Sequence, residues 1–254
     1  MSDKTIDFGF ETIPEEEKRG RVKGVFDSVA SNYDLMNDAM SVGIHRVWKN
    51  MTITRLNPQP GERLLDVAGG TGDIARRFIK AADEVRVRRG GKAASAVICD
   101  INDQMLLAGI DAKKDRGMNL TRVCGNAEML PFEDNQFDVV TIAFGIRNVT
   151  DRMAALREFR RVLKPGGRLG ILEFSMPPSK MISTAYDAYS FAVIPKLGQV
   201  LAGDSDSYQY LIESIRKFPR QEQFAEMIRE AGFANVSYQD YTTGIAALHT
   251  GWKL

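Results

Sequence analysis

The stretch from Leu64 to Ala75 constrains the fold more than any other part of the chain. It runs from apolar residues through one acidic residue into a glycine-rich turn. Apolar residues then return at helical spacing, at Ile74, Phe78 and Ile79. This pattern predicts a strand, a tight loop and a helix whose first backbone N–H groups point into the loop.

The glycine pattern by itself leaves the ligand open. The segment Gly70–Ala75 also fits the fingerprint of dinucleotide-binding proteins, and a packed turn without a ligand is a third interpretation. Asp66, directly before the loop, would repel a pyrophosphate and suits a cationic amino-acid group. Asp100 ends the next apolar run, where an acid can accept hydrogen bonds from both ribose hydroxyls. Its separation from the loop exceeds the usual ~20 residues, which we attribute to a surface loop over 86–92.

The same stretch resembles the first motif of class I methyltransferases that use S-adenosylmethionine. Asp66, Gly70 and Gly72 match that motif, and Ala68 stands where the family often has another glycine. The resemblance implies a Rossmann-like α/β fold. Its parts would be a mainly parallel seven-stranded sheet with a C-terminal antiparallel strand, helices on both faces, an N-terminal helical cap and an inserted helical lid.

Composition suits one globular domain and excludes several other classes of protein. The 254 residues are 44% hydrophobic and 26% charged, and a net charge of +1 argues against a nucleic-acid partner. No apolar run reaches the roughly 18 residues of a membrane span, and residues 1–17 lack a signal-peptide core. Cys99 and Cys124 lie near predicted strands, so we expect two buried free thiols and a cytoplasmic location.

The expected organisation is an arm followed by one domain. Residues 1–20 would form a mobile N-terminal arm with a short extended piece at residues 8–10. Residues 21–254 would form the methyltransferase domain, with a helical cap at 21–57 and a hydrophobic insertion or lid at 176–214. The insertion is rich in aromatic and aliphatic residues, so a lid over a lipid tail, an ordinary helical insertion and a dimer contact are all compatible with it.

Two further segments are far more specific than the glycine loop. The pattern Y-D-x-M-N-x-x-x-S-x-x-x-H-x-x-W begins at Tyr33, and R-V-x-K-P-G-G-x-x-x-x-x-E-x-S begins at Arg161. Through both, the chain resembles the ubiquinone/menaquinone C-methyltransferase family. The resemblance implies C-methylation of a polyprenylated benzoquinol, 2-methoxy-6-polyprenyl-1,4-benzoquinol, with S-adenosylmethionine as methyl donor. Methylation of demethylmenaquinol is a second activity that it allows.

The resemblance also assigns the cofactor site, which would lie at the carboxyl ends of the central strands. The expected contacts are Asp66, Ala68, Gly70, Thr71, Gly72, Asp100, Ile101, Asn126, Ala127 and Ala143. Asn126 fits a plain polar turn equally well. No metal is expected, because the sulfonium already carries an activated methyl group and no metal-ligand cluster is visible.

Catalytic candidates follow the predicted strand 137–144, at the edge where open α/β sheets place their reacting groups. We predict that the Arg147 side chain faces the pocket rather than forming an ion pair at the surface. There Arg147 would stabilise the phenolate that develops on the quinol, or would relay the proton of the quinol hydroxyl through a bound water. Asn148 would orient this arrangement. Tyr33 and His45 are the other candidates for polarising or deprotonating the hydroxyl, although a lone histidine is more often structural.

Three other functions stay open. One is methylation of another small molecule, against which both signatures argue. Another is NAD(P)-dependent oxidation, disfavoured by Asp66 and by the absence of a Tyr-x-x-x-Lys motif. The third is a noncatalytic scaffold in a quinone-biosynthesis complex. The expected partners are the polyprenyl quinol, a second copy of the chain and such a complex, with peripheral contact at the inner face of the cytoplasmic membrane.

Overall fold

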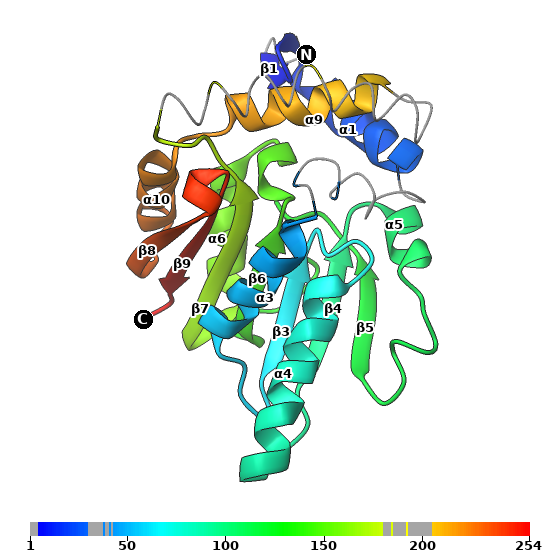
Figure 1. The fold of residues 1–254 in the computed structure, drawn as a ribbon, viewed down its shortest axis with the longest axis vertical. Coiled ribbons are helices and arrows are strands. Elements are labelled where there is room, and N and C mark those ends of the chain that lie inside the picture. The colour runs from blue at the N-terminus through cyan, green and yellow to red at the C-terminus, as the bar shows by residue number, and fades with distance from the viewer. Residues whose placement is uncertain are drawn as a thin grey trace.

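A seven-stranded sheet forms the centre of the computed structural model, which describes residues 5–29, 38, 41, 43–179, 184, 192 and 205–254 (Figure 1). The strand order is β5-β4-β3-β6-β7-β9-β8. The strands are β3 (Arg63–Val67), β4 (Ser95–Asp100), β5 (Asn119–Cys124), β6 (Phe137–Ala143), β7 (Leu163–Phe174), β8 (Ala234–Tyr241) and β9 (Ala246–Trp252). β3 to β7 pair in parallel, whereas β9 runs antiparallel to both of its neighbours. The expected sheet is therefore confirmed.

Helices cover both faces of the sheet. Figure 1 shows α3 (His45–Leu56) and α4 (Asp73–Arg89) in front and α6 (Arg152–Val162) behind, with α10 (Gln221–Glu230) beside β8. Neighbouring residues of a strand point to opposite faces. Leu64 accordingly packs with α3 and α4, while Leu65 packs in the cluster of α6 and α10. Burial on both faces explains why the central strands are apolar without alternation.

A further layer lies over the carboxyl ends of the strands (Figure 1, top). It consists of a hairpin of β1 (Thr5–Phe8) and β2 (Glu11–Pro14), then α1 (Glu15–Val29) and α9 (Ser205–Lys217). We call it the cap layer. Phe8 of the hairpin stacks on Tyr210 of α9 at 4.1 Å between ring centroids. The consecutive hairpin and α1 therefore close this end of the sheet together with α9, which is distant in sequence.

The N-terminal region differs from the sequence-based expectation. Residues 5–20, expected to be an arm with one extended piece at residues 8–10, form the hairpin and the start of α1. The turn at Gly9 has a φ of +60°, a backbone conformation that favours glycine. Within the region expected as a helical cap, α3 packs against α4 and β7 rather than over the carboxyl edge.

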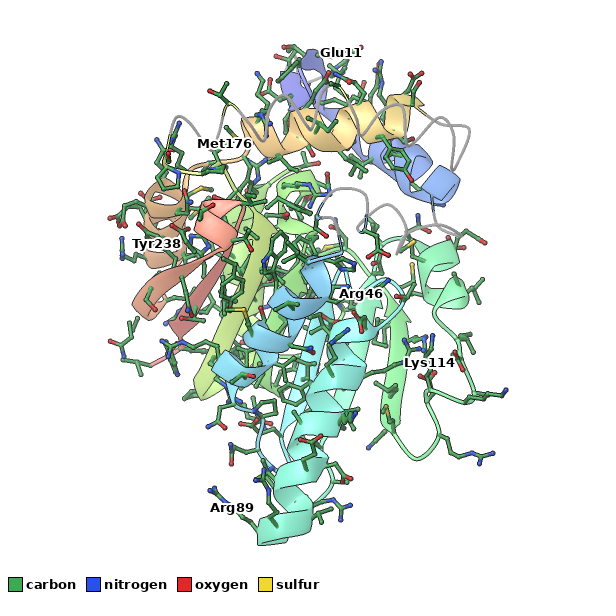
Figure 2. The ribbon with its side chains drawn as sticks, in the orientation of Figure 1. Glu11, Arg46, Arg89, Lys114, Met176 and Tyr238 are labelled. Carbon is green, nitrogen blue, oxygen red and sulfur yellow. The ribbon has the colours of Figure 1, made fainter. Side chains whose placement is uncertain are left out.

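Several boundaries also differ. The surface loop expected at 86–92 is largely helix, because α4 continues to Arg89 at the far end of the molecule (Figure 2). Three arginines in its last turn interact favourably with the helix dipole. α5 spans only Asp103–Ala108. The Lys164–Gly167 segment of the second signature lies within β7, at a register shift opposite β6.

The two cysteines have different environments. Cys99 is buried, as predicted, but Cys124 is exposed, so that part of the prediction is wrong. β5 is an edge strand of the sheet and pairs with only one neighbouring strand, β4. Most of the expected insertion 176–214 lies outside the described residues, apart from 176–179, 184, 192 and α9. No helix in the described part is long and apolar enough to cross a membrane.

Candidate functional site

The loop after β3 doubles back before α4 begins. Ala68, Gly70 and Gly72 all have positive φ, of +48°, +49° and +85°. The φ of Gly72 favours glycine, and a Cβ there would also lie 2.5 Å from the Ile98 Cδ1 atom. Ala68 holds a left-handed conformation that costs a non-glycine residue about 1 kcal/mol or more. The result is a backbone cradle at the start of α4 that a ligand can approach closely.

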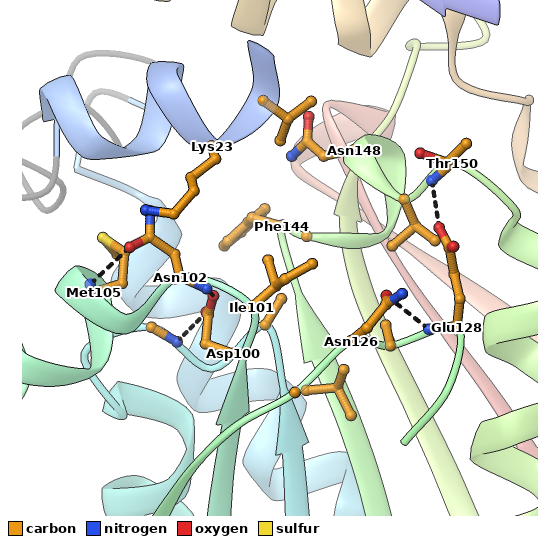
Figure 3. Close-up of a pocket in the computed structure, with 18 residues that line it drawn as sticks. Lys23, Asp100, Ile101, Asn102, Met105, Asn126, Glu128, Phe144, Asn148 and Thr150 are labelled. Atoms are coloured by element: carbon orange, nitrogen blue, oxygen red, sulfur yellow. Dashed lines mark hydrogen bonds between the residues drawn. The ribbon is translucent and has the colours of Figure 1, made fainter. Parts of the chain in front are cut away.

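A pocket opens beside this cradle, under the cap layer (Figure 3). Five segments line it, namely α1, the loop after β3, the β4–α5 turn, the loop after β5 and the turn after β6. Of the residues expected to contact a cofactor, it brings together Ala68, Gly70, Asp100, Ile101, Asn126 and Ala127. Asn148 completes its wall from the side of β6. The pocket therefore joins the loops that sequence reasoning singled out.

Asp100 is held with its carboxylate at the pocket wall. It is 8% exposed, and its Oδ2 accepts the N–H of Gly70 at 2.8 Å while Oδ1 accepts the N–H of Asn102 at 2.9 Å (Figure 3). Burial raises the pKa of this carboxyl, and the two backbone donors oppose that rise. Each carboxylate oxygen can accept more than one hydrogen bond. Asp100 can thus bind a pair of ligand hydroxyls without giving up its own partners.

Asp66 has a different position from Asp100. It is 1% exposed and does not line the pocket, but lies beneath the glycine loop. Its Oδ1 accepts the Thr141 hydroxyl at 2.8 Å, and its Oδ2 has no hydrogen-bond partner among the described residues. Burial raises the pKa of Asp66 to about 7, while the Thr141 hydrogen bond and the positive charge of Lys49 oppose the rise. A cationic ligand group would satisfy this orphaned oxygen.

The raised pKa of Asp66 predicts a pH-dependent stability without ligand. The carboxyl is protonated in the fold up to about pH 7 but only to about pH 4 in the unfolded chain. Between those values the fold binds more protons, so the free energy of unfolding should fall as pH rises, by up to roughly 1.4 kcal/mol per unit. Asp66→Asn should flatten this slope in urea unfolding at about pH 5 and about pH 8. Equal slopes in the two proteins would contradict the assignment.

Asn148 presents a polar group to the pocket from the turn η2 (Ile146–Asn148). Its Oδ1 accepts the Tyr210 hydroxyl at 3.0 Å, while its buried Nδ2 has no partner among the described residues. Burial raises the pKa of Tyr210 to about 12, so this hydroxyl stays protonated and donates at neutral pH. Tyr210 thereby orients the amide and leaves an N–H donor for a ligand.

Arg147 does not line this pocket. It is 2% exposed, and its Nη1 donates to the Glu173 Oε1 atom and the Phe144 carbonyl, both at 2.6 Å. Its Nε donates to the Ser214 hydroxyl at 3.2 Å. The predicted orientation into the pocket is therefore not observed. The guanidinium instead ties the turn after β6 to β7 and α9.

The other expected residues lie away from the pocket. His45 donates its backbone N–H to the Ser41 hydroxyl, and its Nε2 lies 2.9 Å from Asp38 Oδ1. Burial lowers the pKa of His45. His45 and Thr71 line a separate depression, Gly72 is the N-cap of α4 and Ala143 packs in the core. Tyr33 lies outside the described residues.

Sequence reasoning missed several residues that line the pocket. Lys23 comes from α1, and no local signal connects that helix to the site. Asn102 caps α5 by accepting the N–H groups of Gln104 and Met105, a signal that an asparagine before a helix could have given. Glu128 accepts the N–H groups of Thr150 and Asp151 and so joins two of the lining loops.

The residues present fit S-adenosylmethionine. Asp100 offers acceptors for ribose hydroxyls, and Ile101 is a 42% exposed apolar side chain on the wall, suited to an aromatic ring. Asp66 is buried beneath the glycine loop, where its charge would favour a cationic amino-acid group bound on the other side of that loop. Among the residues that the structure describes, no group of three His, Cys, Asp or Glu side chains is placed to hold a metal ion.

Comparisons with known proteins show the family to which the chain belongs. A model of the ubiE/COQ5 methyltransferase family matches residues 13–253. The chain is 55% identical to the ubiquinone/menaquinone biosynthesis C-methyltransferase UbiE of Roseobacter denitrificans, covering 100% of this chain and 98% of that protein. It is 54% identical to the enzyme of that name in Caulobacter vibrioides, over 100% of both. An S-adenosylmethionine-dependent methyltransferase from Thermotoga maritima, 19% identical, shares the fold with a TM-score of 0.57 over 91% of this chain and 99% of that one.

Proposed function

The chain belongs to the ubiE/COQ5 methyltransferase family, and from this premise we propose that its acceptor is a polyprenylated benzoquinol, 2-methoxy-6-polyprenyl-1,4-benzoquinol. The expected enzyme class, an S-adenosylmethionine-dependent C-methyltransferase of quinone biosynthesis, is confirmed. Demethylmenaquinol is the second acceptor that we propose. The names of the full-length relatives couple both quinones to one enzyme.

One observation carries the proposal for the acceptor. The pocket has a cofactor wall at Asp100 and Ile101, and on the side of β6 it has the amide of Asn148 with an unused N–H donor. Phe144 and Val149 make that second wall apolar. A quinol ring of which one hydroxyl is activated needs an apolar surface with a polar contact at that hydroxyl.

The protein side chains would promote methyl transfer mainly by positioning the two reactants and by polarising the quinol hydroxyl. When bound, S-adenosylmethionine supplies a methyl group activated on a sulfonium. We propose that Asn148 donates its Nδ2–H to a quinol oxygen and favours the phenolate, which raises the electron density of the ring carbon. Arg147 acts in this proposal as a positioning residue, because its guanidinium holds the Phe144 carbonyl and Glu173 rather than the pocket. Tyr33 stays a prediction for the group that takes the proton.

Replacing Asn148 by alanine should therefore lower turnover about 100-fold, the usual effect of removing one donor to a developing oxyanion. The dissociation constant of S-adenosylmethionine should change less than about twofold, because the ribose wall is untouched. Initial rates and calorimetric titration measure the two quantities. Turnover equal to that of the unmodified enzyme would reject the donor role.

We further propose that the enzyme works in the cytoplasm, in peripheral contact with the inner face of the membrane. A polyprenyl quinol is held by the bilayer, so the acceptor must be taken up at its surface. We also propose that the enzyme forms a homodimer and takes part in a quinone-biosynthesis complex. Flotation of the enzyme with vesicles, and its sedimentation with and without its partners, test these points.

The direct test is methyl transfer from labelled S-adenosylmethionine to short-tailed 2-methoxy-6-prenyl-1,4-benzoquinol, kept reduced with dithionite. Demethylmenaquinol serves as the parallel acceptor. Product from the first alone assigns a ubiquinone enzyme, and product from both assigns a shared step. No product from either, with the cofactor still bound, would instead favour a scaffold or another small-molecule acceptor.

A further inference from the structure

A second cavity, of about 90 Å³, lies beneath the N-terminal hairpin. Residues of β1, α1, α9 and the segment after β6 enclose it, so it belongs to the cap layer that Figure 1 shows above the sheet. Thr150 is the residue that borders both this cavity and the cofactor pocket, and Figure 3 shows it at the margin of the latter. The cavity and the cofactor pocket are therefore adjacent, but their other lining residues differ.

The cavity wall is strongly cationic. Four of its side chains are Lys18, Arg147, Arg152 and Lys217, against the single carboxylate of Asp7. Two of the four cations have their own counter-ions. Arg147 pairs with Glu173 at 2.6 Å, and Lys217 pairs with Asp7 at 3.4 Å. Among the residues that the structure describes, neither Lys18 nor Arg152 forms an ion pair.

Lys18 is the most informative of these residues. It is only 4% exposed, yet it has no hydrogen bond or ion pair within the described part of the chain. Burial and the positive charge of Arg152 together lower the pKa of Lys18 to about 8. The carboxylates of Asp7 and Glu128 oppose that shift without forming an ion pair with it. At neutral pH the lysine is a buried ammonium that faces another cation.

Arg152 is also incompletely satisfied. Its Nη2 donates to the Arg147 carbonyl at 3.0 Å, but its buried Nε has no partner in the described structure. No carboxylate of the described residues lies within ion-pair distance of its guanidinium. The Arg152 side chain is half-buried, with its guanidinium carbon 5.4 Å from the centroid of the Phe218 ring. Burying an unpaired cation such as Lys18 is unfavourable, and the positive charge of Arg152 on the same cavity adds repulsion. An anion between them would remove both penalties.

We propose that this cavity binds a phosphate group, either free phosphate or the phosphate of an anionic lipid headgroup. A tetrahedral oxyanion can accept from the Lys18 ammonium, the Arg152 Nε and the Thr150 hydroxyl at once. A cavity of about 90 Å³ suits a small group rather than a nucleotide. The site is distinct from the cofactor pocket, although Arg147 and Tyr210 border it, and the proposal does not rest on the function proposed above.

The consequence would be a tighter cap layer. Lys18 belongs to α1 and Arg152 to α6, and the hairpin residues Ile6 and Gly9 lie on the same cavity. A bound phosphate would connect the sheet-facing helix α6 with the layer that covers the acceptor end of the pocket. Its binding should therefore be visible as stabilisation of the whole chain.

Thermal unfolding in phosphate and in chloride of equal ionic strength tests the proposal at about pH 7, where Lys18 is charged. The variant is Lys18→Met, which keeps the length of the side chain and removes its charge. The matched control is Arg21→Met, because Arg21 is an exposed cation of the same helix that pairs with Glu11 and Glu17. Phosphate should raise the Tm of the unmodified protein and of the control by a few degrees, but not that of Lys18→Met.

Chloride supplies a second readout that a merely structural lysine would not give. In chloride, Lys18→Met should unfold at the same temperature as the unmodified protein or above it, because the substitution removes an uncompensated buried charge. A rise in Tm with phosphate that is equal in Lys18→Met and the unmodified protein would overturn the proposal. So would the absence of any phosphate-specific rise.

Sedimentation with vesicles distinguishes the two sources of phosphate. Vesicles of phosphatidylglycerol mixed with phosphatidylcholine are compared with pure phosphatidylcholine. Stronger binding to the anionic vesicles that is lost in Lys18→Met, kept in Arg21→Met and competed by free phosphate assigns the lipid headgroup. Vesicle binding that is equal in all three proteins, together with the phosphate-dependent Tm, assigns free phosphate.

Discussion

Replacing Asp100 by asparagine should raise the dissociation constant of S-adenosylmethionine about 100-fold, the equivalent of two lost charge-assisted hydrogen bonds. The carboxylate accepts the N–H groups of Gly70 and Asn102 and still faces the pocket with spare lone pairs. An amide NH₂ would oppose one of those two N–H donors and would offer a ligand hydroxyl fewer acceptors. The substitution thus weakens the ribose site and the loop that carries it. Calorimetric titration of the enzyme with the cofactor measures the effect.

The control for Asp100 is Asp134→Asn, an equal change of charge at an exposed side chain that pairs with Arg161. Its cofactor affinity should match that of the unmodified enzyme. The unmodified enzyme should also lose affinity as pH falls, because burial raises the pKa of Asp100 and protonation removes acceptors. Asparagine at position 100 should abolish that part of the pH dependence. A dissociation constant within about threefold of the original would refute the placement of the ribose.

The resemblance to the methyltransferase family implies the seven-stranded sheet, and local patterns in the sequence mark the central strands and the loops at their carboxyl ends. The apolar runs before Asp66 and Asp100 are buried strands, because both of their faces are covered by helices. The carboxyl ends of adjacent parallel strands meet at one edge, so the loops after β3, β4 and β5 were expected to converge. They do line one pocket. The buried strands depend on residues that are close in sequence, and the convergence of the loops follows from the parallel order of the strands.

Contacts between distant segments could not be predicted in the same way. Arg147 was expected in the pocket because its turn is there, but Glu173 and Ser214 are 26 and 67 residues further along the chain. Nothing in the local pattern around Arg147 specifies those partners. The hairpin at the N-terminus is a similar case, since Phe8 is stabilised by stacking on Tyr210 of α9. Such pairings become visible only when the elements are assembled.

Replacing Arg147 by alanine should lower the free energy of unfolding by about 3–5 kcal/mol, the usual cost of breaking a buried ion pair by removing one partner. The Arg147 and Glu173 side chains are each 1% exposed, so the remaining carboxylate would stay buried without its counter-ion. Urea unfolding measures the loss. The double variant Arg147→Met/Glu173→Gln removes both charges and should recover most of the stability, because no unpaired charge is left.

Turnover of the same two variants separates positioning from direct chemistry. If Arg147 only holds the turn that carries Asn148, activity measured below the unfolding transition should return in the double variant along with stability. If the guanidinium acts on the quinol oxygen, as the sequence pattern first suggested, turnover should stay low in both variants while the cofactor still binds. The contacts of Arg147 with Glu173, the Phe144 carbonyl and Ser214 leave its side chain fully engaged within the protein. We therefore expect activity to return with the fold, and a stable but inactive double variant would show that this buried arginine reaches the reacting ring.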